Sequence, residues 1–312
     1  MYIFKQMRIA CVFTGQGAQK IGMGREFYEK YGEAKGFFSK ASDIVGYDIS
    51  KLIFEGPEEE LNKTSITQPA VFLVSYTIYE IFKKEVELES LISFFAGHSL
   101  GEYTAVTAAG VLDFEKTIEV VKKRGELMEG VSGGGMSAVI GMDKEKIIDI
   151  CSKYNVEAVN FNSPKQVVIA GRVEDLDRVE PELKNNGAKR VIRLKVSGAF
   201  HSLYMKEVQK EFSDYLDGID FKDAKIPVVT NCDAKPHSVG NEIKDALKKQ
   251  IASPVLWVDS MNFMVENGIG TFIEFGPARV LSNLIVQIVP GAKVYSVYDL
   301  NSFEEVKDAI KG

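Results

Sequence analysis

Residues 97–101 have the types and spacing of a turn that presents a nucleophile. They read Gly-His-Ser-Leu-Gly; the run "LISFFAG" (91–97) is typical of a buried strand, and "LGEYTAVTAAG" (100–110) favours a helix. Glycines on both sides of a serine permit a sharp strand-to-helix turn that exposes the hydroxyl at the helix N-terminus. Ser99 is therefore a candidate nucleophile, and the backbone N–H of Leu100 could stabilise an oxyanion. The alternative is a serine that only caps the helix.

A serine hydroxyl needs a general base, and the chain contains only three histidines. His98 is adjacent to Ser99, and on a strained turn its ring is expected to point elsewhere. His237 lies in the polar stretch "DAKPHSVGN" and is interpreted as a surface histidine. His201 lies in "KVSGAFHSLYM", where a glycine-containing turn precedes a predicted helix. We therefore predict that His201 approaches Ser99 as its base, the alternative being a histidine that caps this helix.

The elements that must position these residues alternate between strand and helix, which predicts an α/β fold with a mainly parallel sheet. After "VSGGGM" (131–136) the order becomes strand-helix-strand-strand-helix-strand, that of a ferredoxin-like unit. We therefore predict a large α/β-hydrolase-like domain, residues 1–131 and 197–312, and an inserted ferredoxin-like subdomain, residues 132–196. In the large domain, strands are expected at 8–13, 91–97, 226–231 and 270–276, and helices at 25–54, 68–84, 113–130, 205–217, 241–250, 257–267 and 278–288. The last strand of the inserted unit is expected at 189–196.

Composition and charge exclude several classes of protein. The formal net charge of −6 argues against general nucleic-acid binding, and no apolar run has the roughly 18 residues that a membrane span requires. The three cysteines are widely spaced and form no metal-binding cluster, so reduced thiols and a cytoplasmic location are expected. The N-terminus lacks the layout of a signal peptide, and residues 1–6 are interpreted as an extension from an upstream start.

Seven motifs appear in a fixed order: "FTGQGAQKIGMG", "GHSLGEY", "KRGELM", "NFNSPKQVVIAG", "VSGAFHS", "QIASPVLW" and "IEFGP". This series resembles the malonyl-CoA:acyl-carrier-protein transacylases of fatty-acid synthesis, and also the acyltransferase domains of polyketide synthases. The resemblance extends from residue 8 to about residue 298, nearly the whole chain. Thr14 departs from it, because many members have proline before "GQG".

The resemblance implies a role for each matching residue. Ser99 would be the nucleophile and His201 its base, oriented by a main-chain carbonyl near Gln250 instead of by an aspartate. Backbone N–H groups of Gln16 and Leu100 would form the oxyanion hole.

The resemblance also implies a substrate carrying a carboxylate. Arg124 would bind the malonyl carboxylate through a two-pronged salt bridge, although a Lys-Lys-Arg run on a helix is usually a solvated face. Phe200 would fill the space of an α-methyl group, and Asn162 and Ser197 would line the pocket.

The implied function is transfer of malonyl from malonyl-CoA to the phosphopantetheine thiol of acyl carrier protein, through a malonyl-serine intermediate. The expected enzyme is a cytoplasmic monomer that uses no cofactor or metal, and fatty-acid synthesis is favoured over a polyketide pathway. Acyl carrier proteins are generally acidic, so the basic segment 184–195 is a candidate docking surface, the alternative being a solvated strand edge.

Three other functions fit parts of the pattern. A serine esterase or thioesterase would need an acidic residue to orient His201. A Ser-Asp lipase would need an Asp-Gly partner, and Asp217-Gly218 is better interpreted as a helix C-terminus. An inactive carrier-binding module is disfavoured because Ser99, His201, Gln16 and Arg124 are all present.

Overall fold

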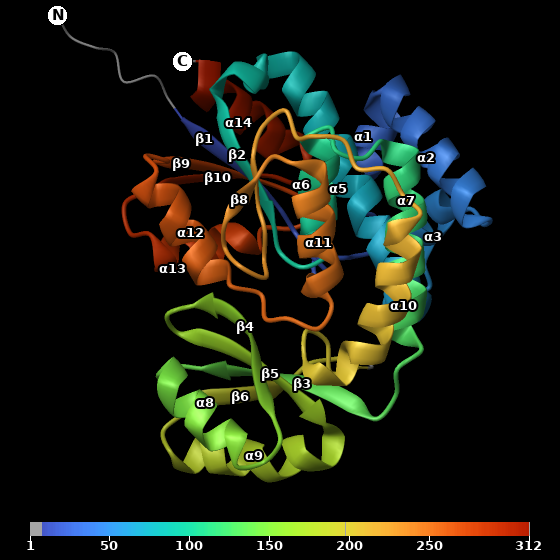
Figure 1. The fold of residues 1–312 in the computed structure, drawn as a ribbon. Coiled ribbons are helices and arrows are strands. Elements are labelled where there is room, and N and C mark those ends of the chain that lie inside the picture. Colours follow the sequence, from blue (N-terminus) through green and yellow to red (C-terminus); the bar gives the residue numbers. More distant parts are fainter. Residues whose placement is uncertain (1–7, 197, 312) are drawn as a thin grey trace, which may run out of the picture.

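The large domain is built on a six-stranded sheet. The computed structural model describes residues 8–196 and 198–311 (Figure 1). The strands of this sheet are β1 (Ile9–Phe13), β2 (Ile92–Gly97), β7 (Val228–Val229), β8 (Pro236–His237), β9 (Thr271–Phe275) and β10 (Lys293–Val297). Their spatial order is β10-β9-β1-β2-β7-β8, and every neighbouring pair is parallel except β7 with β8. The predicted α/β class with a mainly parallel sheet is confirmed.

Helices cover both faces of this sheet, because successive side chains of a strand point to opposite sides. Ile9, Cys11 and Phe13 of β1 join a core with α5 and α7, whereas Ala10 and Val12 join a second core with α12 and α13. The helices of the large domain are α1 (Arg25–Lys30), α2 (Gly32–Val45), α3 (Ile49–Glu55), α4 (Glu58–Leu61), α5 (Thr64–Val86), α6 (Gly101–Ala108), α7 (Phe114–Glu129), α10 (Lys206–Asp217), α11 (Gly240–Gln250), α12 (Trp257–Glu266), α13 (Leu281–Ile288) and α14 (Leu300–Lys311), with 3-10 turns at Leu88–Leu91 and Leu203–Met205.

A second, antiparallel sheet forms the smaller subdomain. Its elements follow the predicted order: β3 (Gly134–Ile140), α8 (Lys144–Ser152), β4 (Glu157–Ser163), β5 (Gln166–Arg172), α9 (Val173–Asn185) and β6 (Arg190–Arg193). The spatial order β4-β5-β3-β6 is that of a ferredoxin-like sheet, and α8 and α9 share an apolar core with it. The predicted boundary between residues 196 and 197 falls at Ser197, which lies outside the described residues.

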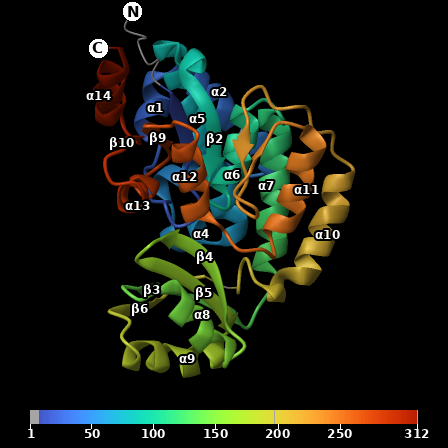
Figure 2. The same cartoon turned by 60° about the vertical axis from the view of Figure 1, so that its left-hand side comes forward.

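Backbone hydrogen bonds join the subdomain to the large domain. The N–H of Phe161 donates to the carbonyl of Val255 at 3.0 Å, and the N–H of Val255 donates to the carbonyl of Val159 at 2.7 Å. Strand β4 is accordingly the part of the subdomain that faces the large domain, with α9 at the far end (Figures 1 and 2). The segment after α11 is therefore fixed between the two parts.

Two predicted strands are shorter than expected. The run 226–231 contains only β7, because Pro227 lacks a backbone N–H and Thr230 instead closes a turn by donating to the carbonyl of Lys235. The run 189–196 contains only β6. In the described residues no helix has the length and apolar character that crossing a membrane requires.

Candidate active site

Ser99 occupies a strained turn between β2 and α6. Its φ of 51° lies in the left-handed region, which costs on the order of 1–3 kcal/mol for a residue with a side chain. The flanking glycines are sterically required: a Cβ on Gly97 would lie 2.0 Å from the carbonyl carbon of Gly101, and one on Gly101 would lie 2.0 Å from the carbonyl oxygen of Phe13. The sequence therefore forms a nucleophile turn in which no larger residue fits at position 97 or position 101.

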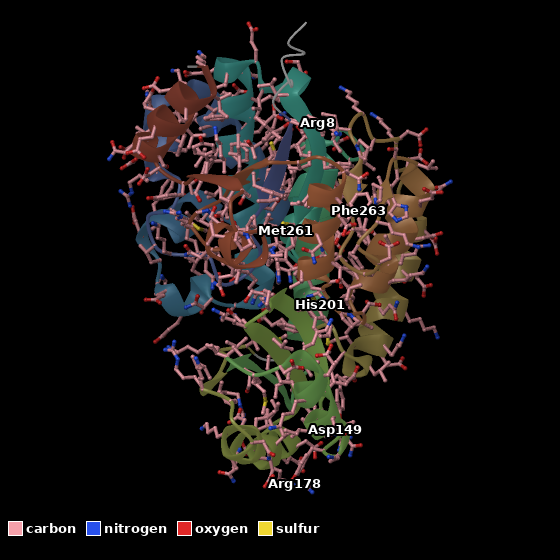
Figure 3. The ribbon with its side chains drawn as sticks, turned by 90° about the vertical axis from the view of Figure 1, so that its left-hand side faces the viewer. Arg8, Asp149, Arg178, His201, Met261 and Phe263 are labelled. Carbon is pink, nitrogen blue, oxygen red and sulfur yellow. The ribbon has the colours of Figure 1, made fainter. Side chains whose placement is uncertain are left out.

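The structure brings His201 to Ser99 from a segment more than 100 residues away. The distance from Ser99 Oγ to His201 Nε2 is 2.7 Å, and that from His201 Nδ1 to the main-chain oxygen of Gln250 is 2.9 Å. A carbonyl can only accept, so Nδ1 carries the proton and Nε2 is left to accept one from Ser99. Figure 3 shows His201 where the subdomain meets the large domain.

Burial keeps this imidazole neutral. Burial first, and then the positive charge of Arg124, lower the pKa of His201 to about 3, although the hydrogen bond to Gln250 opposes the shift. An unprotonated ring is the form that a general base needs. The pair can therefore act as hydroxyl and base throughout the neutral pH range.

Arg124 is a buried cation beside the hydroxyl. Its side chain projects from α7 and the residue is 1% exposed. Nη2 donates to Ser99 Oγ at 3.2 Å and to Gln250 Oε1 at 3.0 Å, and Nη1 donates to Gln68 Oε1 at 2.8 Å. No carboxylate in the described part of the chain forms a salt bridge with it. The sequence alternative of a solvated face is wrong for Arg124, although it holds for Lys123, which pairs with Glu211 at the surface.

The backbone N–H groups of Gln16 and Leu100 have no hydrogen-bond acceptor among the described residues. Leu100 immediately precedes α6, so its N–H lies at the positive end of that helix. The Gln16 loop lies against the nucleophile turn, because a Cβ on Gly15 would approach the carbonyl oxygen of His98 to 2.3 Å. These groups are available to bind an oxyanion.

The remaining predicted residues have different positions. Phe200 is buried, and its ring packs over Gly198. Asn162 Oδ1 of β4 accepts from His98 Nε2 at 2.7 Å, and this hydrogen bond links the subdomain to the nucleophile turn. Ser197 lies outside the described residues. His237 is partly exposed and lies between Asp233 and Glu242, in agreement with its interpretation as a surface histidine.

Three buried residues near the site were missed by the sequence interpretation. Gln68 accepts from Arg124, Glu102 accepts from Gln250, and Asn231 bonds to the backbone of the nucleophile turn. Gln68 and Asn231 lie outside all seven motifs, so the sequence gives no signal for either residue. Glu102 is the only acidic residue within "GHSLGEYTAV", and its position three residues after Ser99 could have indicated a role near the site.

A cavity of about 650 Å³ lies between the subdomain and the turn that follows His201. It is lined by Asn155, Val156 and Phe161 of the subdomain and by Leu203 and Tyr204 of the large domain, among others. No cluster that could hold a metal ion occurs within residues 8–196 and 198–311.

Comparison with known proteins identifies the family to which this chain belongs. The family model described as "Acyl transferase domain" matches residues 10–300. The chain belongs to the acyl transferase family. It is 41% identical to the malonyl CoA-acyl carrier protein transacylase of Bacillus subtilis (strain 168). The alignment covers 97% of this chain and 98% of that protein.

Solved structures of other acyl transferases have the same fold. An acyl carrier protein S-malonyltransferase from Vibrio cholerae is 38% identical, with a TM-score of 0.91 over 96% of this chain and 99% of that one. A malonyl-transacylase in complex with a type II polyketide synthase acyl-carrier protein is 39% identical, with a TM-score of 0.93 over 97% of this chain and 99% of that one.

Proposed function

We propose that this acyl transferase moves a malonyl group from malonyl-CoA to the phosphopantetheine thiol of acyl carrier protein. The observation that carries the proposal is Arg124: its buried guanidinium lies 3.2 Å from Ser99 Oγ and forms no salt bridge with a carboxylate of the described residues. A buried charge without a salt-bridge partner is costly, and a guanidinium matches a carboxylate in geometry. The malonyl carboxylate is one methylene away from the carbonyl that the serine attacks, so one substrate can reach both groups.

In the first half-reaction Ser99 Oγ attacks the thioester carbon while His201 Nε2 accepts the hydroxyl proton. The N–H groups of Leu100 and Gln16 stabilise the oxyanion. Each such donor typically raises the rate by a factor of about 10²–10³. The carbon–sulfur bond then breaks, and the CoA sulfur takes the proton from His201. Malonyl remains on the serine as an ester.

In the second half-reaction the carrier thiol gives its proton to His201 and its sulfur attacks the ester carbonyl. The carbon–oxygen bond breaks, and Ser99 recovers the proton from His201. Neither half-reaction needs an oxidant, a metal or a cofactor, in keeping with the proposal that none is used.

The acceptor that orients His201 distinguishes this proposal from the hydrolase alternatives. An esterase triad would place a carboxylate at Nδ1, where the main-chain oxygen of Gln250 lies. Asp217, the candidate partner of a Ser-Asp lipase, pairs with Lys248.

The test is intact mass spectrometry after the protein is mixed with malonyl-CoA. A malonyl adduct should form on the wild type and not on Ser99→Ala, and holo-acyl carrier protein should remove it faster than water does. Absence of the adduct on folded wild-type protein would refute the proposal.

The proposed destination of the malonyl group is fatty-acid synthesis. Three free cysteines support a cytoplasmic location. The monomeric state stays a prediction.

A further inference from the structure

The side chain of Asn231 spans the turn that carries Ser99. Asn231 lies just after β7 and is 1% exposed. Its Oδ1 accepts from the backbone N–H of Ser99 at 2.7 Å, and its Nδ2 donates to the carbonyl of Gly97 at 2.7 Å. One amide group therefore holds the backbone on both sides of residue 98.

This contact acts on a strained conformation. Ser99 has a φ of 51°, and such a backbone persists only where its surroundings hold it in place. Among the described residues, the N–H of Ser99 has no acceptor other than Asn231 Oδ1. Without that acceptor the turn loses the bond that fixes the direction of the serine backbone.

Glu102 connects Asn231 to the base side of the site. Its side chain is fully buried, and Oε2 accepts from the N–H of Asn231 at 3.0 Å and from Gln250 Nε2 at 2.8 Å. Gln250 Nε2 also donates to the carbonyl of Ser99 at 2.9 Å, while the main-chain oxygen of Gln250 holds His201 Nδ1. The carboxyl group thus links the segment that supports the nucleophile to the segment that orients the base.

We propose that Asn231 and Glu102 are positioning residues that set the hydroxyl of Ser99 against the ring of His201. Neither side chain forms a hydrogen bond to Ser99 Oγ or to the His201 ring. They act through the backbone of Ser99 and through Gln250. The inference rests on the proposed function, since it concerns the reactivity of the same hydroxyl.

The experiment measures the single-turnover rate of Ser99 acylation by malonyl-CoA, by rapid quench and intact mass, in five proteins besides wild type. They are Asn231→Ala, Asn231→Asp, Glu102→Ala, Glu102→Gln and the control Thr230→Val. Thr230 precedes Asn231, is fully buried and bonds to Asp233, away from the turn, so its loss reports on stability alone. Thermal unfolding is measured for all five.

A misplacement of about 1 Å typically costs about 10²-fold in rate, so Asn231→Ala should acylate about 10²-fold more slowly at saturating malonyl-CoA. The concentration giving half-maximal rate should change less than about threefold, because Asn231 does not contact Arg124. Asn231→Asp keeps the acceptor for Ser99 but cannot donate to Gly97, so its rate should fall about tenfold. If Asn231→Ala does not fold, the rate of Asn231→Asp tests the role of Asn231 in its place.

The Glu102 variants test the link to the base. Burial raises the pKa of Glu102 to about 7, so a neutral glutamine, which keeps an acceptor oxygen, is a close replacement. Glu102→Gln should stay within about threefold of wild type, whereas Glu102→Ala should fall about as far as Asn231→Ala.

Acylation by both Asn231 variants at the rate of Thr230→Val would overturn the inference. Rate losses in Glu102→Gln and Glu102→Ala that are equal would overturn the role of Glu102. Absence of a malonyl adduct on the wild type would refute the proposed function instead, so the two failures are distinguishable.

Discussion

Replacing Arg124 with alanine should change which acyl group the protein accepts. A bound malonyl carboxylate would gain two charge-assisted hydrogen bonds from the buried guanidinium, each worth about 1.5–3 kcal/mol. Losing both removes about 3–6 kcal/mol of transition-state binding, or about 10²–10⁴ in kcat/KM for malonyl-CoA. Acetyl-CoA has no carboxylate, so its binding in the wild type leaves the buried guanidinium without a carboxylate partner. Arg124→Ala removes that cost, and kcat/KM for acetyl-CoA should rise.

The assay compares acylation of Ser99 by malonyl-CoA and by acetyl-CoA under the same conditions. Lys123→Ala is a matched control, because that lysine is the preceding residue of α7 and its charge lies at the surface with Glu211. Lys123→Ala should keep the malonyl preference of the wild type. Arg124→Lys should recover only part of it, because an ammonium keeps the charge without the two-pronged geometry. An unchanged ratio of malonyl to acetyl rates in Arg124→Ala would refute the carboxylate assignment.

The same substitution has a second readout in the pH dependence of acylation. Arg124 lowers the pKa of His201 by charge repulsion, so removing it should raise that pKa and move the acid limb of the kcat/KM profile to higher pH. A profile that does not move, in a variant shown to be folded, would indicate that the two groups are not coupled.

Three further predictions follow from the geometry. Because burial and the charge of Arg124 lower the pKa of His201 to about 3, the wild-type acylation rate should stay level as the pH falls through 6.5, the ordinary histidine value, and a midpoint near 6.5 would contradict this. Gly101→Ala should lower the free energy of unfolding by about 1–3 kcal/mol or more in chemical denaturation, because its Cβ would lie 2.0 Å from the carbonyl oxygen of Phe13. Charge reversal at the exposed Lys189 and Arg190 should raise KM for acyl carrier protein and leave KM for malonyl-CoA unchanged; equal effects on both substrates would exclude docking there.

The elements around Ser99 and the order of the subdomain could be predicted because their signals are local. Glycines two residues before and after the serine, a preceding apolar run and helical periodicity all lie within a few residues of the features that they determine. The extent of β7 was not predictable in this way, since Thr230 and Asn231 leave the strand to form turn and tertiary contacts.

The burial of Arg124 could have been predicted from the spacing of its neighbours, although its charge favours an exposed position. Thr117, Val121, Arg124 and Met128 recur at helical spacing and all lie on the buried face of α7. Placing the arginine on this stripe would have excluded a solvated position without reference to any family. The contacts of Asn231 with residues 97, 99 and 102 had no such signal, because each joins segments about 130 residues apart that only the folded sheet brings together.

The acceptor at His201 Nδ1 belongs to the peptide backbone, and this has an evolutionary consequence. A single nucleotide change can delete an aspartate from a hydrolase triad, but every amino acid at position 250 supplies a carbonyl oxygen. Drift at this codon can alter the bonds to Arg124 and Glu102 while the imidazole keeps its tautomer. Selection that changes the side chain at position 250, and with it the hydrogen bonds of Arg124, can therefore proceed without removing the acceptor that orients His201.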